Sequence, residues 1–417
     1  MLHSPNVLPN LLSRSAALLG MCAAIGNFAG AADAAYNPSM KKFPKALGVQ
    51  TLAMVSVDFA GETPLPFGND IVQQQTFDAP GSVADYYHRA SFGQFTIQGN
   101  VFGPVTLSPN VIDSNCSDNS LTQVNALAYQ AVKQQTGSDI SSFTNYGFTL
   151  PRTTATAGCD LGGFTHGNGF VDLETRAKFG LTPGKFYEGV VVHEDGHEEG
   201  LSHANELSCY GKKNRPVLFS ILRFIDGNCR EIPYGDPVDP MGEGEVTTGT
   251  PPDMSAINKA RLGWLKPSNI RTMTHSGVAF IRPLEEPTNG TQLVRVPDGL
   301  TVNGEQHYYY LDFRQPVNLD SSIPVTSPLF KGVMIREAGS LDVNDRSLGQ
   351  PLSDFTEFID TTPDTPSAVD GALKPGKIFK DSSAGIKFQT LSVSSAGAEI
   401  RVSIQRKRKQ RRNAVAK

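Results

Sequence analysis

Three histidines lie close together between residues 193 and 203, and a glutamate directly follows the first of them. The segment HEDGHEEGLSH places His193, Glu194 and His197 in the spacing H-E-x-x-H, with Gly200 and His203 at later intervals of three. On a helix, residues four apart share one face, so His193 and His197 can reach one ion. Glu194 is turned by about 100° from His193, where it can contact a water on that ion. This pattern is typical of a zinc site with a carboxylate as general base.

A helix followed by a sharp turn must position these side chains. Residues 185–200, KFYEGVVVHEDGHEEG, have the length of a helix and end at Gly200. Glycine adopts positive φ at little cost, so it can bring His203 back towards the same ion. The full pattern with Gly200 and His203 is about a thousandfold rarer by chance than H-E-x-x-H alone. We therefore predict Zn²⁺ ligation by His193, His197 and His203; the alternative is a polar surface helix with solvated histidines.

The same eleven residues resemble the zinc motif of the metzincin endopeptidases. In metzincins a turn that contains a methionine lies beneath the metal. The segment YGDPVDPMGEG resembles that turn, and the resemblance gives Met241 a packing role. The chain is most similar to the gametolysin-like secreted metallopeptidases. This likeness rests on the following segments: SVADYYHRASFGQ, SHANELSCYG, YGDPVDPMG, INKARLGWL and FIDTTP with GALKPGKIF. The resemblance implies a metzincin-like peptidase domain that hydrolyses peptide bonds with Glu194 as general base.

The histidine helix departs from the family pattern at its acidic residues. Asp195 and Glu199 occupy positions that are normally apolar, and the position of Glu198 is often asparagine in the family. Some metzincins have a tyrosine ligand two residues after the turn methionine, where this chain has Glu243. Buried carboxylates cost several kcal/mol each unless they are compensated or protonated. Three outcomes stay open: buried cationic partners, a second bound cation, or an impaired site.

Length and composition indicate a folded protein with two domains. The 417 residues exceed one ordinary core, and 39% hydrophobic with 19% charged residues is typical of globular chains. We predict an α+β zinc peptidase domain over residues 47–266. An all-β sandwich-like C-terminal domain is predicted over 267–405, where short β-branched runs alternate with turn residues. Residues 406–417 form a basic tail that we expect to be disordered.

The N-terminus predicts export. Residues 1–31 read as a signal peptide and residues 32–46 as a linker, because Arg14 precedes an apolar run that ends in small residues. The alternative of a membrane anchor is disfavoured, since the run is shorter than the ~20 residues of a spanning helix and contains Asn27. We expect a secreted protein, extracellular or periplasmic, without stable membrane insertion. Four cysteines then remain and allow three pairings; we favour Cys209 with Cys229 and Cys116 with Cys159.

Local patterns predict several elements of the peptidase half. Residues 47–59 read as a buried strand, Ser82 as the N-cap of a short helix, and residues 95–107 as a hairpin. Residues 121–135 have helical spacing that ends at Gly137, and residues 145–151 read as a strand. Residues 158–170 read as a glycine-rich loop in which His166 could line the cleft, although a loop histidine is more often solvated.

These features predict a secreted zinc endopeptidase. We expect a monomer that acts on protein or peptide substrates and does not bind nucleic acid. The alternative is a catalytically impaired metzincin-like scaffold that serves as an extracellular binding protein, which the acids beside the histidines favour. Asp342, Asn344 and Asp345 are a candidate Ca²⁺ site, although short Asx-rich loops usually form turns.

Overall fold

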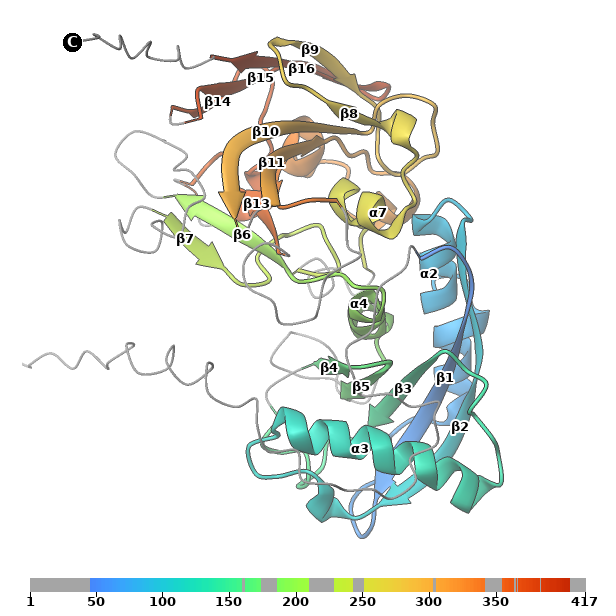
Figure 1. Ribbon diagram of the computed structural model, residues 1–417. Coiled ribbons are helices and arrows are strands. Elements are labelled where there is room, and N and C mark those ends of the chain that lie inside the picture. The colour runs from blue at the N-terminus through green and yellow to red at the C-terminus, as the bar shows by residue number, and fades with distance from the viewer. Residues whose placement is uncertain are drawn as a thin grey trace, which may run out of the picture. The chain divides into compact units, whose positions relative to one another are not determined.

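The computed structural model describes residues 46–159, 162–173, 186–209, 229–242, 251–302, 305–341, 355–363, 365, 367–382 and 384–405. The predicted signal peptide, nearly all of the linker, Glu243, the Asx-rich loop and the basic tail lie outside these ranges. No helix within them is both long and apolar enough to cross a bilayer. The described chain is a mixed α/β structure with few helices and several sheets (Figure 1).

A five-stranded sheet carries the first half of the described chain. Its order is β2-β1-β3-β5-β4, with all neighbours parallel except β4, which runs antiparallel to β5 at the edge. The strands are β1 (Gly48–Phe59), β2 (Phe95–Leu107), β3 (Asn145–Leu150), β4 (Gly163–His166) and β5 (Gly169–Leu173). A mostly parallel sheet is covered on both faces, which explains the continuous apolar run of the first strand.

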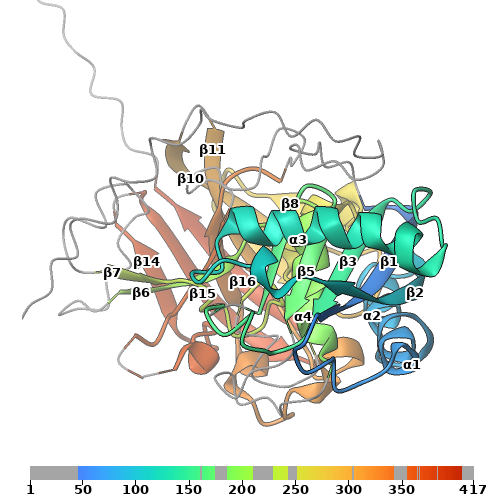
Figure 2. The same ribbon diagram turned by 90° about the horizontal axis from the view of Figure 1, so that it is seen from below.

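Helices cover both faces of this sheet. On one face, Ala53, Val55 and Val57 of β1 share a core with α3 (Asp118–Ala131). On the other, Leu52 and Met54 share a core with α2 (Val83–Ala90) and α4 (Glu188–Glu198). Figures 1 and 2 show α3 on the face opposite to α2 and α4. Two shorter helices, α1 (Asn69–Gln73) and α7 (Ala256–Leu262), complete the set that the figures label.

Several local predictions are confirmed. Ser82 caps α2 by accepting a hydrogen bond from the backbone N–H of Asp85 at 3.2 Å. Helix α3 continues through a π-helical turn, Val132–Thr136, and Gly137 ends it with φ of 76°. The predicted strands at 47–59 and 145–151 are β1 and β3.

Two local predictions are wrong. Residues 95–107 form the single strand β2, not a hairpin, and β2 pairs in parallel with β1 along its length. The segment is an edge strand whose first half packs against the core of α2 and α4 and whose last residues pack against the core of α3. The segment predicted as a glycine-rich loop instead contains the short hairpin of β4 and β5. Glycine is found in strands as well as in loops, where it permits close packing of the strand against a helix.

A seven-stranded sheet joins segments from both sides of residue 266. Its order is β7-β6-β13-β12-β11-β10-β8. The strands are β6 (Ala204–Cys209), β7 (Cys229–Ile232), β8 (Ile270–Thr272), β10 (Leu293–Val302), β11 (Glu305–Asp312), β12 (Met334–Ala338) and β13 (Thr356–Ile359). Strand β6 begins directly after His203 and pairs in parallel with β13. The strand that follows the three histidines thus belongs to the same sheet as the C-terminal strands.

A four-stranded sheet packs with the C-terminal strands. It has the order β14-β15-β16-β9 and contains β9 (Gly277–Ile281), β14 (Ile378–Asp381), β15 (Ile386–Ser394) and β16 (Gly397–Ile404). One apolar core joins both sheets, and Tyr309 of β11 contacts the rings of Phe379 and Phe388 across it. The prediction of a β-sandwich over 267–405 is met only in part, since the larger sheet also includes β6 and β7. Two separate domains divided at 266 stay a prediction.

One of the two predicted disulfides is present in the structure. Cys116 and Cys159 are bonded and link the start of α3 to the segment that precedes β4. The register of β6 and β7 places the backbones of Cys209 and Cys229 opposite each other. Their side chains lie outside the described residues, so that disulfide stays a prediction.

We predict that residues 47–266 do not fold without the C-terminal strands. A chain that ends at residue 266 lacks β13, the strand partner of β6. It also lacks the apolar cluster of Phe330, Met334 and Phe358 that buries Val238. We expect this chain to be insoluble or to unfold without a cooperative transition, measured by circular dichroism during denaturation. A chain that ends at 405 should unfold like the full-length protein. Cooperative unfolding of a stable chain of residues 47–266 would contradict this prediction.

Candidate metal centre and its surroundings

Helix α4 ends in a hydrogen-bonded turn that reverses the chain. The N–H of Gly200 donates to the carbonyl of His197 at 2.9 Å, and the N–H of Leu201 donates to the carbonyl of Gly196 at 3.0 Å. These two bonds form a Schellman motif, which requires a left-handed residue at the position of Gly200. Gly200 has φ of 88°, where a side chain would strain the backbone. The turn brings His203 back beside the helix.

The three histidines of the motif converge on one point. The Nε2 atom of His197 lies 3.2 Å from Nε2 of His193 and 3.1 Å from Nε2 of His203. The opposite nitrogens of His193 and His197 contact the carbonyl oxygens of Pro240 at 2.8 Å and of Leu201 at 2.7 Å. Because a carbonyl only accepts, Nδ1 carries the proton in both rings. Nε2 therefore presents its lone pair to the centre.

The donor set fits a zinc ion. Burial, followed by the neighbouring imidazoles, lowers the pKa of His193, His197 and His203 to about 3, so all three rings are neutral near pH 7. Neutral imidazoles are the form that binds metal. In a tetrahedral zinc site with bonds of ~2.0–2.1 Å, ligand nitrogens lie about 3.3–3.4 Å apart. The observed separations are close to this value. Within the described part of the chain, these histidines are one of two groups able to hold a metal ion.

The methionine turn packs directly beneath the helix. Met241 is fully buried, and a Cβ atom at Gly196 would lie only 2.6 Å from its Sδ. The glycine within H-E-D-G-H is thus explained by the close approach of this turn. The turn also pairs with the start of β6, because the N–H of Ala204 donates to the carbonyl of Met241 at 2.7 Å. Pro240, which orients His193, belongs to the same turn.

Strand β4 positions the carboxylate of Glu194. The hydroxyl of Thr165 lies 2.5 Å from Oε2 of Glu194 and 3.1 Å from its backbone carbonyl oxygen. A Cβ atom at Gly163 would lie 2.3 Å from Oε1 of Glu194, so only glycine leaves room for this side chain. Sequence reasoning missed both residues, although the glycine-rich run GGFT was a usable signal. His166 does not join them, because strand alternation places it on the opposite face from Thr165.

The three acids that depart from the family pattern are buried. Asp195, Glu198 and Glu199 expose 0%, 1% and 7% of their surface. The side-chain amide of Gln50 donates a hydrogen bond to Oε1 of Glu199. Burial raises the pKa of Tyr87 well above its usual value, and the charges of Asp195 and Glu199 raise it further. Asp195 and Glu199 thus face the interior around α2 and β1, not the centre of the three histidines.

Tyr234 is a site residue that sequence reasoning did not single out. Its ring lies 4.1 Å from the ring of His203 and 5.9 Å from that of His193, measured between centroids. Its backbone N–H donates to Oδ1 of Asn205 at 2.9 Å, and its φ of 62° is unusual for a bulky residue. The aromatic ring of Tyr234 therefore packs against the third histidine. No local pattern marks such a contact between residues thirty positions apart.

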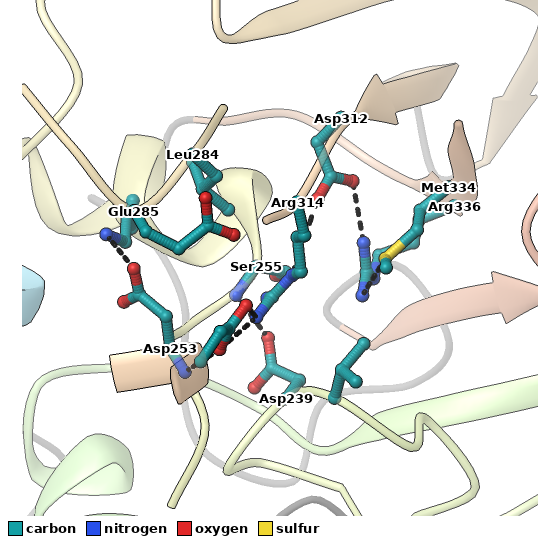
Figure 3. A network of polar contacts seen from close by, with 12 residues as sticks. Asp239, Asp253, Ser255, Leu284, Glu285, Asp312, Arg314, Met334 and Arg336 are labelled. Carbon is teal, nitrogen blue, oxygen red and sulfur yellow. Dashed lines mark hydrogen bonds and ion pairs between the residues drawn. The ribbon is translucent and has the colours of Figure 1, made fainter. Parts of the chain in front are cut away.

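A buried ion network connects the methionine turn to the C-terminal strands. Arg336 of β12 donates from Nε to Asp236 of the turn at 2.6 Å and from Nη1 to Asp312 of β11 at 2.7 Å. All three side chains are at most 1% exposed. Figure 3 shows Arg314 and Arg336 on either side of Asp312. Burial lowers the pKa of Arg336, but Asp236 and Asp312 outweigh this effect and raise it.

The network continues to helix α7. Asp239 of the turn accepts hydrogen bonds from the N–H of Ser255 at 2.8 Å and from the amide of Asn258 at 3.0 Å. Lys259 pairs with Asp253 at 2.6 Å, and both side chains are fully buried. Burial raises the pKa of Asp253 to about 6, although Lys259 lowers it. The turn beneath the histidines is thereby held from α7 and from β12 together.

Comparison with known proteins bears on the histidine segment. Residues 68–212 match the family of the gametolysin peptidase M11. The predicted resemblance to the gametolysin-like metallopeptidases is confirmed. The matched segment runs from the residue before α1 past the three histidines. Because this family consists of metallopeptidases, the match implies a bound metal. No curated protein matches the chain.

Two solved structures have a distant likeness to the chain. Wild-type OgpA from Akkermansia muciniphila is 10% identical with a TM-score of 0.30, covering 73% of this chain and 92% of its own. Catalytically inactive OgpA in complex with an O-glycopeptide, glycodrosocin, is 9% identical with a TM-score of 0.30, covering 73% and 91%. At this TM-score neither structure contributes to the interpretation of the site.

We predict that the metal-free protein loses stability as the pH falls below about 6.5, the ordinary pKa of histidine. The folded state binds no proton at the three histidines until the pH approaches 3, the lowered pKa value. The unfolded state takes up protons throughout that window, so stability is full above 6.5 and decreases towards 3. Denaturant unfolding in chelator at pH 7.5, 6.5, 5.5 and 5.0 measures the slope. His197→Gln should reduce it; an equal slope in both proteins would contradict the assignment.

We predict a strong dependence of stability on Arg336. Arg336→Met leaves Asp236 and Asp312 buried without this cation, which should lower the free energy of unfolding by about 3–5 kcal/mol. Adding Asp236→Asn should recover about 1–3 kcal/mol of that loss, measured as a double-mutant cycle in denaturant. Arg401→Met, which removes an exposed arginine, serves as the control and should change stability by less than about 0.5 kcal/mol. A cost below about 1 kcal/mol for Arg336→Met would overturn this account.

Proposed function

We propose that the chain is a secreted, monomeric zinc-dependent endopeptidase with a metzincin-like peptidase domain. His193, His197 and His203 would hold Zn²⁺, and Glu194 would act as general base. The observation that carries the proposal is the convergence of three Nε2 atoms beside a buried carboxylate. The family match over residues 68–212 supports a metallopeptidase. Secretion rests on the N-terminal sequence.

The residues around the centre have separable tasks. When bound, zinc supplies Lewis acidity that polarises a carbonyl oxygen and makes water more acidic. The carboxylate of Glu194 would accept a proton from the attacking water and deliver it to the leaving amine. Thr165 holds Oε2 of Glu194, which fixes the orientation of the carboxylate before any substrate binds. The carbonyls of Pro240 and Leu201 keep two imidazoles in the metal-binding tautomer.

The edge strand beside Glu194 supports a protein or peptide substrate. Strand β4 is the last strand of its sheet, and among the described residues no strand pairs with its outer side. An extended peptide can add to such an edge through backbone hydrogen bonds, which do not depend on sequence. Because Thr165 of β4 contacts Glu194, a peptide on this strand would pass close to the general base. We propose β4 as the substrate-binding strand.

A non-catalytic binding protein is the second candidate. The observation in its favour is the burial of Asp195, Glu198 and Glu199 within the histidine helix, where related sequences are expected to be apolar or neutral. A cost of several kcal/mol for each buried carboxylate could loosen the helix that carries two of the proposed ligands. Zinc content together with chelator-sensitive hydrolysis of an unstructured protein separates the two candidates.

We predict that Glu194→Gln abolishes peptide hydrolysis while metal binding is kept. Loss of general base catalysis should reduce kcat by about 10²–10⁴-fold, measured with casein or a fluorogenic peptide mixture. The amide keeps the shape of the carboxylate, so zinc content by mass spectrometry should be unchanged. Glu188→Gln makes the same chemical change at the first turn of α4 and should retain activity. Full activity of Glu194→Gln would reject the general-base assignment, and an inactive wild type that contains zinc would reject the enzymatic proposal.

A further inference from the structure

A second group of metal-ligating side chains lies in the C-terminal strands. Asp298, His307 and Glu337 each offer a ligand atom, and these atoms all lie within 4.8 Å of one another. The three residues come from β10, β11 and β12, which are adjacent in the seven-stranded sheet. Their side chains are 2%, 1% and 2% exposed. This group is separate in sequence and in its strands from the histidines of α4.

The strand register explains why the three residues meet. Pro297 lies opposite Tyr308, and Tyr309 lies opposite Glu337. Since side chains alternate between faces, Asp298, His307 and Glu337 all project to the face that Tyr309 occupies. That face is the one packed against the four-stranded sheet, and it also carries apolar residues such as Val296 and the buried Glu357, which lies opposite Glu337. The chain therefore places three ionisable residues side by side at positions that otherwise face a hydrophobic core.

Burial of these groups requires compensation. A buried carboxylate costs several kcal/mol unless hydrogen bonds and opposite charge offset the loss of water. The surroundings add negative charge, because Asp381 accepts a hydrogen bond from the Tyr309 hydroxyl at 3.0 Å on the same face. A divalent cation would neutralise this acidic environment.

The ligand types indicate the class of cation. One imidazole with two carboxylates is a nitrogen and oxygen set that suits divalent transition metals such as Zn²⁺. Calcium instead takes 6–8 oxygen ligands. The backbone N–H of Leu300 donates to Oδ1 of Asp298 at 2.7 Å, which orients that carboxylate as outer hydrogen bonds do in metal sites. Because the three residues are almost completely buried, an ion bound there would be out of reach of a substrate.

We propose that Asp298, His307 and Glu337 bind a structural divalent transition-metal ion that ties β10, β11 and β12 together. This site is distinct from the proposed catalytic centre and does not depend on that assignment. The competing arrangement is a protonated imidazole shared by the two carboxylates, which needs no metal. The two arrangements differ in metal content and in the response of stability to added metal.

The decisive test counts zinc ions in the full-length protein loaded with Zn²⁺ and freed of excess. The wild type should hold two ions per chain, and the His193→Ala/His197→Ala variant should keep one, because only the first centre is removed. Zinc should also raise the thermal midpoint of that variant. A folded variant that holds no zinc would overturn the proposal. If the variant does not fold, the wild type is compared with His307→Gln: one ion fewer in folded His307→Gln supports the second site, and an equal count rejects it.

Substitutions at the second site localise the ion. His307→Gln and Glu337→Gln keep side-chain volume and should each lower the wild-type count from two to one, with peptide hydrolysis retained. His275→Gln changes an exposed histidine in the same half of the chain and should leave the count at two. An unchanged count in folded His307→Gln and Glu337→Gln variants would show that the ion binds elsewhere and would reject the assignment.

Discussion

The convergence of three neutral imidazoles, with Nε2 of His197 3.1–3.2 Å from Nε2 of the other two, is the constraint on which the rest of the structure depends. Their lone pairs repel unless a cation lies between them, so the fold must hold the rings in place. The Schellman turn at Gly200 supplies the return of the chain and, through Leu201, the carbonyl that orients His197. The methionine turn supplies the carbonyl for His193. Each of these two turns requires a glycine. The Schellman turn requires Gly200 because of its positive φ, and the methionine turn requires Gly196 because Met241 packs against it.

The support for this arrangement comes from both halves of the chain. Asp236 and Asp239 in the methionine turn are held by Arg336 of β12 and by the start of α7. The strand after His203 pairs with β13, and Val238 is buried among C-terminal residues. Buried ion pairs contribute little net stability, but loss of one partner is strongly destabilising. The C-terminal strands therefore act as a structural support for the histidine centre, and the two halves depend on one another.

The parts of the fold that the sequence could predict are those set by local chemistry. The cap at Ser82, the end of α4 at Gly200 and the buried strand β1 each follow from a few neighbouring residues. The prediction of a hairpin at residues 95–107 was wrong, because alternation of apolar and polar residues does not distinguish a hairpin from one long edge strand. The partners of Glu194 and His203 could not be predicted. Thr165 and Tyr234 reach them through strand pairing between distant segments.

The most direct test of the central claim is a crystal structure of the zinc-loaded protein with anomalous diffraction data at the zinc edge. The account predicts an anomalous peak about 2.0–2.1 Å from Nε2 of His193, His197 and His203. No peak among these three rings, or rings turned away from a common centre in a zinc-loaded crystal, would contradict it.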